Sequence, residues 1–254
     1  MTALITGASS GIGRDMARIL ARKGISLILV ARRTDPMEEL KKEFSVPTEI
    51  ISCDLSDKNN IYALYEQVKD RNIDILINNA GFGVFGRFCD TDLERETEMI
   101  ATNVTAPHML MKLFLRDMKK RDFGYILNVA SSAAFLPGPL FSSYYASKAY
   151  VHRLTRAVAY ELKKDGSNVY VGSLCPGPIR TNFDEVANVR FSIPMLSSEF
   201  VAEYAIKKMF RKKQVIVPGL NMKAGRLGAK LAPERLQLYF AYNTQRKKFG
   251  RDEK

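Results

Sequence analysis

Tyr144 and Lys148, a tyrosine and a lysine four residues apart, are the residues whose types and spacing point most directly to chemistry. Four residues are about one turn of an α-helix, so the two side chains would share one face. An ammonium group near a phenol favours the phenolate, and it would lower the tyrosine pKa from its usual value of about 10. Such a tyrosine could exchange a proton near neutral pH. The spacing alone is common, so the interpretation depends on the surrounding residues.

A glycine-rich turn near the N-terminus predicts a second site, one for a dinucleotide. The turn covers residues 7–13 (GASSGIG), follows a short apolar run and opens an amphipathic segment. Gly7 permits the sharp turn, Gly11 lets backbone amides approach a pyrophosphate, and Gly13 lets the helix pack closely on the sheet. The N-terminus of that helix would then face the anion.

Two arginines indicate which dinucleotide would bind. An NAD site usually carries an acid at the end of the second strand, but here Ala31 holds that place and is followed by Arg32 and Arg33. A guanidinium would pair with a 2′-phosphate, which favours NADP(H) over NAD(H). Asp35 is the alternative acid, although with Pro36 it fits better as an N-cap before a proline at the first helical position. Both arginines could also be solvated surface charge.

Apolar runs alternate with amphipathic stretches along the chain, which predicts a Rossmann-like, doubly wound α/β fold with a parallel sheet of about seven strands. We expect strands at Ala3–Thr6, Ser26–Val30, Glu49–Ser52, Ile73–Ile77, Gly124–Val129, Asn168–Leu174 and Gln214–Val217. We expect helices at Ile12–Lys23, Pro36–Phe44, Lys58–Asp70, Asp92–Lys120 (with a break at Asn103 as one possibility), Tyr144–Lys164 and Ser198–Phe210. The long irregular loop over 176–197 is typical of a lid.

The domain prediction is one unit over residues 1–219, including the whole site, with a basic helical extension of the same domain over 220–254. The net charge of +12 is concentrated late: residues 207–254 hold 14 Lys or Arg against 3 Asp or Glu, and residues 1–206 carry only +1. The extension has a helix start at Pro233 and mixes basic with apolar side chains. Three interpretations stay open: packing on the domain or on a partner subunit, peripheral contact with a membrane surface, and attraction of an anionic acyl thioester. No nucleic-acid-binding module is recognised.

The cysteines and histidines indicate neither a metal site nor a disulfide framework. Cys53, Cys89 and Cys175 are far apart and form no C-x-x-C, which suggests a reducing compartment. His108 and His152 have no partners at metal-ligand spacing. Because no targeting segment or membrane-spanning run is recognised, we expect a cytoplasmic protein.

These motifs together resemble the classical short-chain dehydrogenases/reductases. The resemblance rests on the glycine turn, the Asn78-Asn79-Ala80-Gly81 motif, a serine before Y-x-x-x-K, and Pro176-Gly177 after the sixth strand. Segments 79–86 and 215–219 are similar to the DltE-like subgroup in particular. The resemblance implies a homodimer or homotetramer, with contacts through the helices near Asn103–Lys120 and Tyr144–Lys164.

The resemblance implies four catalytic residues. Tyr144 would be the general acid/base, Lys148 would lower its pKa and hold the nicotinamide ribose, and Ser131 would polarise a carbonyl. Asn103 would kink its helix and hold a relay water, although it could simply cap the following helix. Ser131 could be a turn former, and a register shift by one would bring in Tyr145 or Ser132, against which the spacing argues.

The resemblance also implies the cofactor contacts, with Asp54 at the adenine and Ile179 and Thr181 near the carboxamide. The residues concerned are Gly7, Ser9, Ser10, Gly11, Ile12, Gly13, Arg32, Arg33, Asp54, Leu55, Asn79, Ala80, Gly81, Tyr144, Lys148, Pro176, Gly177, Ile179 and Thr181.

The expected function is an NADP(H)-dependent oxidoreductase that interconverts a carbonyl and an alcohol by hydride transfer. The small-molecule substrate would be apolar, because aromatic and leucine side chains gather near the strand ends and lid. The candidates are Phe82, Phe85, Phe88, Phe135, Leu136, Phe141, Phe183 and Phe191. One alternative is an NADP-sensing regulatory protein, which would not need an intact Ser131–Tyr144–Lys148 set. Another is a reductase of lipid or 3-oxoacyl substrates at a membrane surface.

Overall fold

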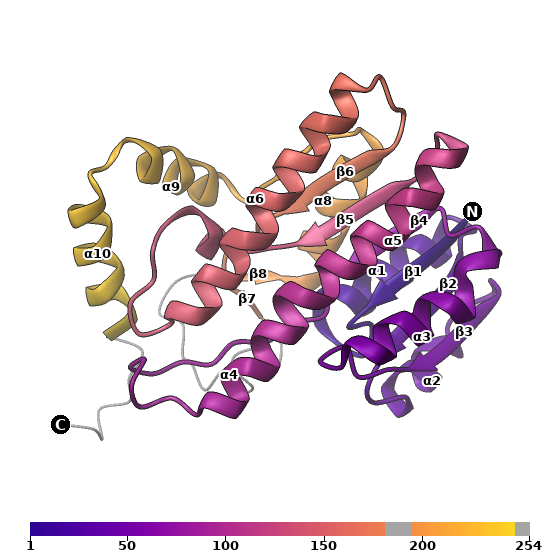
Figure 1. Ribbon diagram of the computed structural model, residues 1–254, viewed down its shortest axis with the longest axis horizontal. Helices are drawn as coiled ribbons and strands as arrows, with labels where there is room; N and C mark the ends of the chain where they lie inside the picture. The colour runs from indigo at the N-terminus through magenta and orange to yellow at the C-terminus, as the bar shows by residue number, and fades with distance from the viewer. Residues whose placement is uncertain (181–194, 247–254) are drawn as a thin grey trace.

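The computed structural model describes residues 1–180 and 195–246, and its centre is a parallel sheet (Figure 1). The strand order is β3-β2-β1-β4-β5-β6-β9, so the chain starts in the middle, winds outward to β3 and returns beside β1. The expected doubly wound fold is thereby confirmed. The strands are β1 (Thr2–Thr6), β2 (Ser26–Ala31), β3 (Thr48–Ser52), β4 (Ile75–Asn78), β5 (Tyr125–Val129), β6 (Tyr170–Leu174) and β9 (Val215–Ile216).

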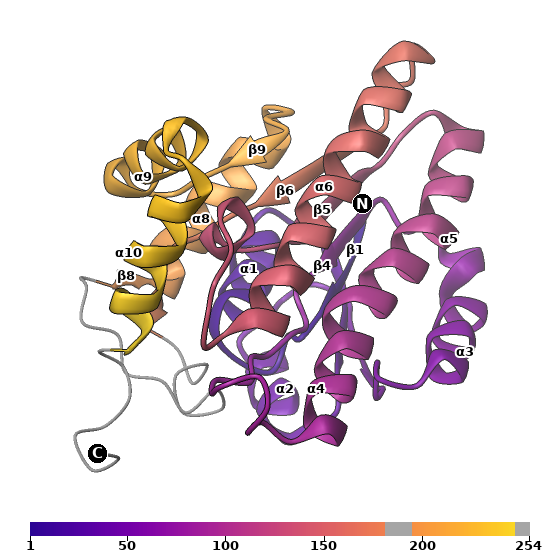
Figure 2. The same cartoon turned by 60° about the vertical axis from the view of Figure 1, so that its left-hand side comes forward.

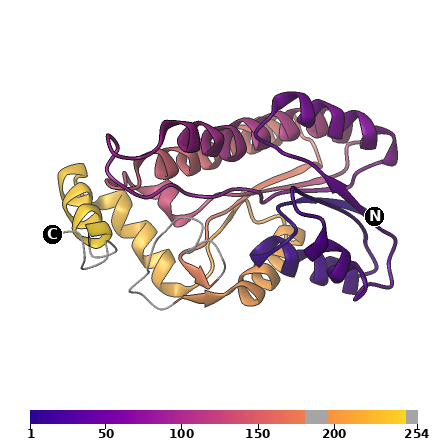
Figure 3. The same cartoon turned by 90° about the horizontal axis from the view of Figure 1, so that it is seen from below.

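Helices cover both faces of the sheet, which explains why its strands are continuous apolar runs rather than alternating ones. Figure 3 shows the three layers edge-on, with the sheet between them. The helices packed on one face are α3 (Lys58–Val68), α5 (Ala106–Arg121) and α6 (Ser142–Lys164), and those on the other are α1 (Gly11–Arg22), α2 (Asp35–Lys41) and α8 (Ser198–Phe210). Each expected strand and helix is present, with its ends shifted by three residues or fewer.

The long helix expected over 92–120 is interrupted at Asn103. It consists of α4 (Leu93–Ile100), a π-helical turn η2 (Ala101–Thr105) and α5. Asn103 directs its amide away from the helix, where Nδ2 donates to the Phe82 carbonyl at 2.8 Å and Oδ1 accepts from the Phe82 amide at 3.1 Å. Because Pro107 offers no amide hydrogen to the first turn of α5, regular helix bonding is also relaxed there. Single π turns of this kind occur frequently at functional sites.

The start of α2 differs slightly from expectation. The N-cap is Thr34, and Asp35 is the first helical residue, followed by Pro36. The expected N-cap role of Asp35 is therefore wrong by one position, although a carboxylate in the first turn still suits the positive end of the helix dipole.

The C-terminal extension forms two helices, α9 (Leu220–Leu231) and α10 (Glu234–Arg246), and the sequence reading anticipated only the second. They lie together at the end of the molecule far from the N-terminus, near the start of α6 (Figures 1 and 2). The Gln237 amide donates to the carbonyls of Ala229 and Ala232 at 2.9 and 2.8 Å, so it fastens the corner between the helices. The domain boundary at residue 219 stays a prediction.

The base of the expected lid is closed by a small parallel pair, β7 (Ile179–Arg180) with β8 (Leu196–Ser197). Residues 181–194 between them, which include Thr181, Phe183 and Phe191, lie outside the described part of the chain.

Candidate active site

A cavity of about 1230 Å³ runs along the carboxyl ends of the strands and continues to the two C-terminal helices. It begins at the ends of β1 and β4, the two neighbouring strands from which the chain winds in opposite directions across the sheet. This is the usual ligand position in doubly wound folds. The cavity brings together most of the site residues expected from the sequence: Gly7, Ser9, Ser10, Gly11, Ile12, Arg32, Arg33, Asp54, Leu55, Asn79, Ala80, Gly81, Ser131, Tyr144, Lys148, Pro176, Gly177 and Ile179.

The glycine turn forms one end of this cavity, and its shape depends on missing side chains. Gly7 has φ 64°, and a Cβ there would lie 2.8 Å from the Ala80 Cα. A Cβ on Gly13 would lie 2.4 Å from both the Gly7 carbonyl oxygen and the side-chain nitrogen Nδ2 of Asn79. Gly13 is itself buried behind the turn, so it is a packing residue and does not line the cavity. A side chain at either position would clash with the turn or with the residues after β4 that pack on it. The two glycines therefore allow the turn a shape that fits the approach of a pyrophosphate to backbone amides.

Thr6 and Asn79 hold the glycine turn against β4. The Thr6 hydroxyl accepts hydrogen bonds from the backbone amides of Asn79 and Ala80 at 3.0 and 3.1 Å. The Asn79 side chain donates to the carbonyls of Thr6 and Gly7, both at 3.0 Å. Asn79 therefore acts as a brace for the turn, and the cradle is rigid before any ligand arrives.

The Asp54 carboxylate is oriented by its own loop. It accepts hydrogen bonds from the Ser56 amide at 3.0 Å and the Ser56 hydroxyl at 2.8 Å. These bonds hold the pKa of Asp54 below its ordinary value. The carboxylate is therefore ionised and fixed at the cavity edge, where it suits a hydrogen-bond donor on a bound base.

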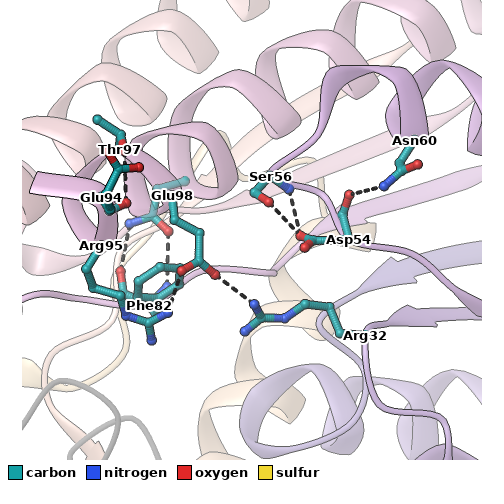
Figure 4. A network of polar contacts seen from close by, with 10 residues as sticks. Arg32, Asp54, Ser56, Asn60, Phe82, Glu94, Arg95, Thr97 and Glu98 are labelled. Atoms are coloured by element: carbon teal, nitrogen blue, oxygen red, sulfur yellow. Dashed lines mark hydrogen bonds and ion pairs between the residues drawn. The ribbon is translucent and has the colours of Figure 1, made fainter.

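Arg32 is engaged in an ion pair that the sequence did not indicate. Its guanidinium contacts Glu98 of α4 at 2.7 Å, and the other Glu98 oxygen contacts Arg95 at 2.5 Å (Figure 4). Arg95 in turn lies over the Phe82 ring, 4.1 Å from its centre. Glu98 thus bridges Arg32, at the end of β2, to Arg95, which in turn contacts the loop after β4 through Phe82. Arg33 is exposed at the same edge.

Ser131 and Tyr144 meet near the middle of the cavity. Ser131 follows β5 and is the N-cap of η3 (Ser132–Phe135), where its hydroxyl accepts a hydrogen bond from the Ala133 amide at 3.1 Å. The alternative role of this serine, to form a turn, is therefore present as well. The same serine hydrogen-bonds to Tyr144 from α6. The Tyr144 ring stacks on Phe141 with centroids 4.5 Å apart, and the side chain is 8 % exposed. The fold therefore brings Ser131 and Tyr144 together, and their catalytic roles stay predictions.

The pKa of Tyr144 differs from the expectation. Burial raises it well above the ordinary value, and the hydrogen bond with Ser131 offsets only part of that rise. The expected lowering by Lys148 is therefore wrong for this structure. Lys148 Nζ lies 5.7 Å from the centre of the tyrosine ring and donates to the Val129 carbonyl at 3.2 Å.

Lys148 is itself strongly perturbed. Its side chain is 5 % exposed, and burial lowers the pKa of its ammonium from 10.5 to about 8. Space for it depends on Gly81, where a Cβ would come within 3.2 Å of Nζ and 2.7 Å of the Asn103 amide oxygen. The lysine is thus a buried cation near the hydrogen-bonded hydroxyls of Ser131 and Tyr144, a combination that typifies functional sites more than stable cores.

Asn103 lies behind the cavity wall. It is fully buried and bonds the Phe82 backbone, while Nδ2 also reaches the Ser147 hydroxyl at 3.1 Å. It therefore links the helix bearing Tyr144 to the strand end bearing Gly81. Its expected kinking of the helix is present, and its relay-water role stays a prediction.

Of the apolar candidates within the described residues, Phe82, Leu136 and Phe141 line the cavity. The others have different surroundings: Phe85 packs on Phe141, Phe135 packs edge-on against His152, and Phe88 is largely exposed. Sequence alone could not separate these cases, because all of them follow strand ends.

The far wall of the cavity comes from α9 and α10, which the sequence analysis had not assigned to the site. The residues contributed are Met222, Gly225, Gly228, Ala229, Ala232, Leu236, Gln237, Phe240, Ala241, Thr244 and Gln245. These residues recur every three or four positions, which places them on one face of each helix. This periodicity is the signal in the sequence that could have assigned the extension to the site. Tyr145, the neighbour that spacing excluded from the acid/base role, also lines the cavity.

Comparison with known proteins decides the family. The sequence model of the short chain dehydrogenases matches residues 1–190, about three quarters of the chain. The chain belongs to the short chain dehydrogenase family. The expected recognition is thereby confirmed, and the DltE-like subgroup stays a prediction.

Individual members of the short chain dehydrogenase family agree. An uncharacterized oxidoreductase of Staphylococcus epidermidis is 33% identical over 185 residues, covering 72% of this chain and 80% of its own length. A human protein named inactive hydroxysteroid dehydrogenase-like protein 1 is 30% identical, covering 82% of this chain and 65% of its own. The structure of a short-chain dehydrogenase from Sphingobium yanoikuyae in complex with NADPH has a TM-score of 0.80 and 30% identity, covering 92% and 99%. The chain is thus related to oxidoreductases that use a nicotinamide cofactor.

Within the described residues, none of the helices combines the length and the apolar character that crossing a bilayer requires.

Proposed function

We propose that this protein is an NADP(H)-dependent oxidoreductase that interconverts a bulky, largely apolar ketone and its alcohol. The observation that carries the proposal is the hydrogen-bonded pair of Ser131 and Tyr144, set in one cavity with the buried Lys148 and with a glycine cradle suited to a pyrophosphate. Nothing in a purely structural cavity requires a buried cation beside two hydroxyl groups.

The side chains divide the chemistry as follows. When bound, the nicotinamide supplies or accepts the hydride at the substrate carbon. Ser131 and Tyr144 can both donate hydrogen bonds to the substrate oxygen, on which negative charge develops during reduction. Tyr144 then gives its proton to that oxygen, so the product is an alcohol and the tyrosine is left as a phenolate. Lys148 places a positive charge near this phenolate, and oxidation of an alcohol follows the same path in reverse.

The buried state of Tyr144 fits the acid role. A phenol whose pKa is raised holds its proton at neutral pH and can deliver it, whereas an ionised phenol could not. The raised pKa therefore keeps on Tyr144 the proton that reduction of a carbonyl requires.

The test is Tyr144→Phe, with NADPH absorbance as the readout on a panel of bulky ketones. We expect turnover to fall by a factor of about 100 to 10,000, because general acid catalysis is lost. NADPH affinity should stay within about twofold, since the ring and its stacking on Phe141 are kept. Tyr160→Phe, an exposed tyrosine further along α6, is the matched control. Undiminished turnover of Tyr144→Phe would refute the mechanism.

The alternative is a nucleotide-binding protein without catalytic turnover. The observation in its favour is that a human relative is named an inactive hydroxysteroid dehydrogenase-like protein. A binding protein would need the cradle but not the reactive pair. The complete set of Ser131, Tyr144 and Lys148, held in contact by α6 and the β5 loop, therefore supports an enzyme. NADPH binding without turnover of any ketone in the panel would instead support the binding protein.

Assembly and membrane contact stay predictions. Exposed apolar residues on the extension, including Leu220, Leu227 and Leu231, lie among its basic residues and support peripheral membrane contact or a subunit interface. Sedimentation velocity of the full chain and co-sedimentation with anionic liposomes would separate these two outcomes.

A further inference from the structure

Gln245, near the end of α10, is a buried polar residue on the wall of the cavity. It is 2 % exposed, and its Nε2 donates to the Tyr145 hydroxyl at 2.5 Å. Among the described residues, no group pairs with its other amide atom, Oε1. Turning the amide around would only exchange the two atoms, so in either orientation one polar atom is without a partner among them.

A buried amide atom without a hydrogen-bond partner lowers the stability of the folded protein. Buried polar groups in proteins nearly always have hydrogen-bond partners, and those that lack one need an explanation. Gln245 does not sit in a sealed core. It lines the same cavity as Tyr144 and the glycine cradle, so a ligand in that cavity would lie against its side chain, and a small turn of the amide would bring the unpaired atom to it.

The surroundings of Gln245 are otherwise apolar and roomy. Leu236, Phe240 and Ala241 lie on the same face of α10 and also line the cavity. Across from them, α9 presents Gly225 and Gly228, and a Cβ at either glycine would meet no atom within 4 Å. Glycine is unfavourable inside a helix, and packing does not require these two. Their effect is to leave space for a wide ligand.

Tyr145 ties Gln245 to the reacting end of the cavity. Its ring centre lies 6.3 Å from that of Tyr144. The ring also lies so close to Gly138 that a Cβ there would come within 2.2 Å of it. Tyr145 is thus fixed in place, and through its hydroxyl it fixes the Gln245 amide at the side of the cavity opposite the cradle.

We propose that Gln245 is a specificity-determining residue that hydrogen-bonds a polar group on the substrate, remote from the reacting carbonyl. This inference rests on the proposed reductase function. The matching substrate is a bulky ketone with an apolar body and a hydroxyl group at its far end. The carbonyl meets Ser131 and Tyr144, the body lies against Phe240 and the small residues of α9, and the hydroxyl donates to the free amide oxygen of Gln245.

The test compares two probes of equal shape. One is cyclohexylcyclohexanone with its rings joined opposite the carbonyl, and the other is the same ketone with a hydroxyl at the far end of the second ring. For the unmodified protein we expect kcat/KM to be about tenfold higher for the hydroxylated probe, the value of one neutral hydrogen bond. Gln245→Met keeps the length of the side chain without its polar atoms. This variant should bring the ratio to about one, mainly by raising KM for the hydroxylated probe.

The control separates recognition from mere support of α10. Tyr242→Met replaces an exposed tyrosine of α10 that does not line the cavity. It should keep the preference for the hydroxylated probe. The compared quantity is the ratio of kcat/KM for the two probes. Because unfolded protein lowers both values equally, partial unfolding does not change this ratio.

The outcomes are distinct. An equal preference in the unmodified protein and in Gln245→Met, or no preference in the unmodified protein, overturns the proposal for Gln245 while leaving the reductase intact. Failure to reduce either probe, although NADPH binds, contradicts the proposed substrate class, and the inference falls with it.

Discussion

Replacing Lys148 with methionine should make the folded protein more stable and remove its activity. The folded state holds an ammonium group that burial disfavours, lowering its pKa from 10.5 to about 8. Because one pH unit corresponds to about 1.4 kcal/mol, the folded state is destabilised by about 3 kcal/mol at neutral pH. The variant loses the hydrogen bond from Nζ to the Val129 carbonyl, which contributes about 1 kcal/mol. The net expectation is a gain of about 2 kcal/mol.

The sign of the pH dependence gives a second, independent check. Below about pH 8 the lysine is protonated in both folded and unfolded chains, and the folded protein carries the whole penalty. Between pH 8 and 10.5 the folded chain releases the proton first, so the unfolded chain binds more protons and the stability contribution of this group rises with pH. The advantage of Lys148→Met should therefore be largest at neutral pH and shrink as the pH rises towards 10.5.

The assay is urea unfolding at several pH values, followed by tyrosine fluorescence or circular dichroism. Lys163→Met is the control, because that lysine lies exposed near the end of the same helix. It should change stability by only a few tenths of a kcal/mol, with little pH dependence. A variant Lys148→Met that is less stable than the unmodified protein at neutral pH would refute the reasoning, as would an advantage that does not change with pH.

Three further predictions concern the two ends of the cavity. Arg32→Ala should weaken NADPH binding by about tenfold and leave NADH binding unchanged, because a charge-assisted hydrogen bond to the 2′-phosphate is lost; equal effects on both nucleotides in fluorescence titrations would contradict the NADP(H) assignment. Glu98→Gln is the counterpart, since it frees the guanidinium from its ion pair and should tighten NADPH binding. Gly228→Ala should raise the midpoint of thermal unfolding, because alanine favours the helix by about 1 kcal/mol relative to glycine. It should also raise KM for bulky ketones, because the added methyl group enters the cavity. An unchanged KM would show that α9 does not contact the substrate.

Much of the site was predictable from local sequence because its chemistry sits at strand ends. In a parallel sheet the carboxyl ends of all strands meet at one edge, so a motif after each strand is enough to bring Gly7, Asn79 and Ser131 together. The helical spacing of Tyr144 and Lys148 places both on one face in the same way. The break at Asn103 was also foreseeable, but its cause was not, since it lies in the backbone of Phe82, which is 21 residues away.

The sequence by itself determined the α/β fold class, the succession of strands and helices along the chain and the family, because these follow from spacing within single elements and from the order of elements. Tertiary structure decided the rest. Burial, which no local pattern encodes, set the pKa of Tyr144 above its ordinary value and that of Lys148 below it. The contact of Gln245 with Tyr145 joins residues 100 positions apart and turns a basic extension into the wall of the cavity. Such contacts form only when the chain packs, because they join residues that are far apart in the sequence.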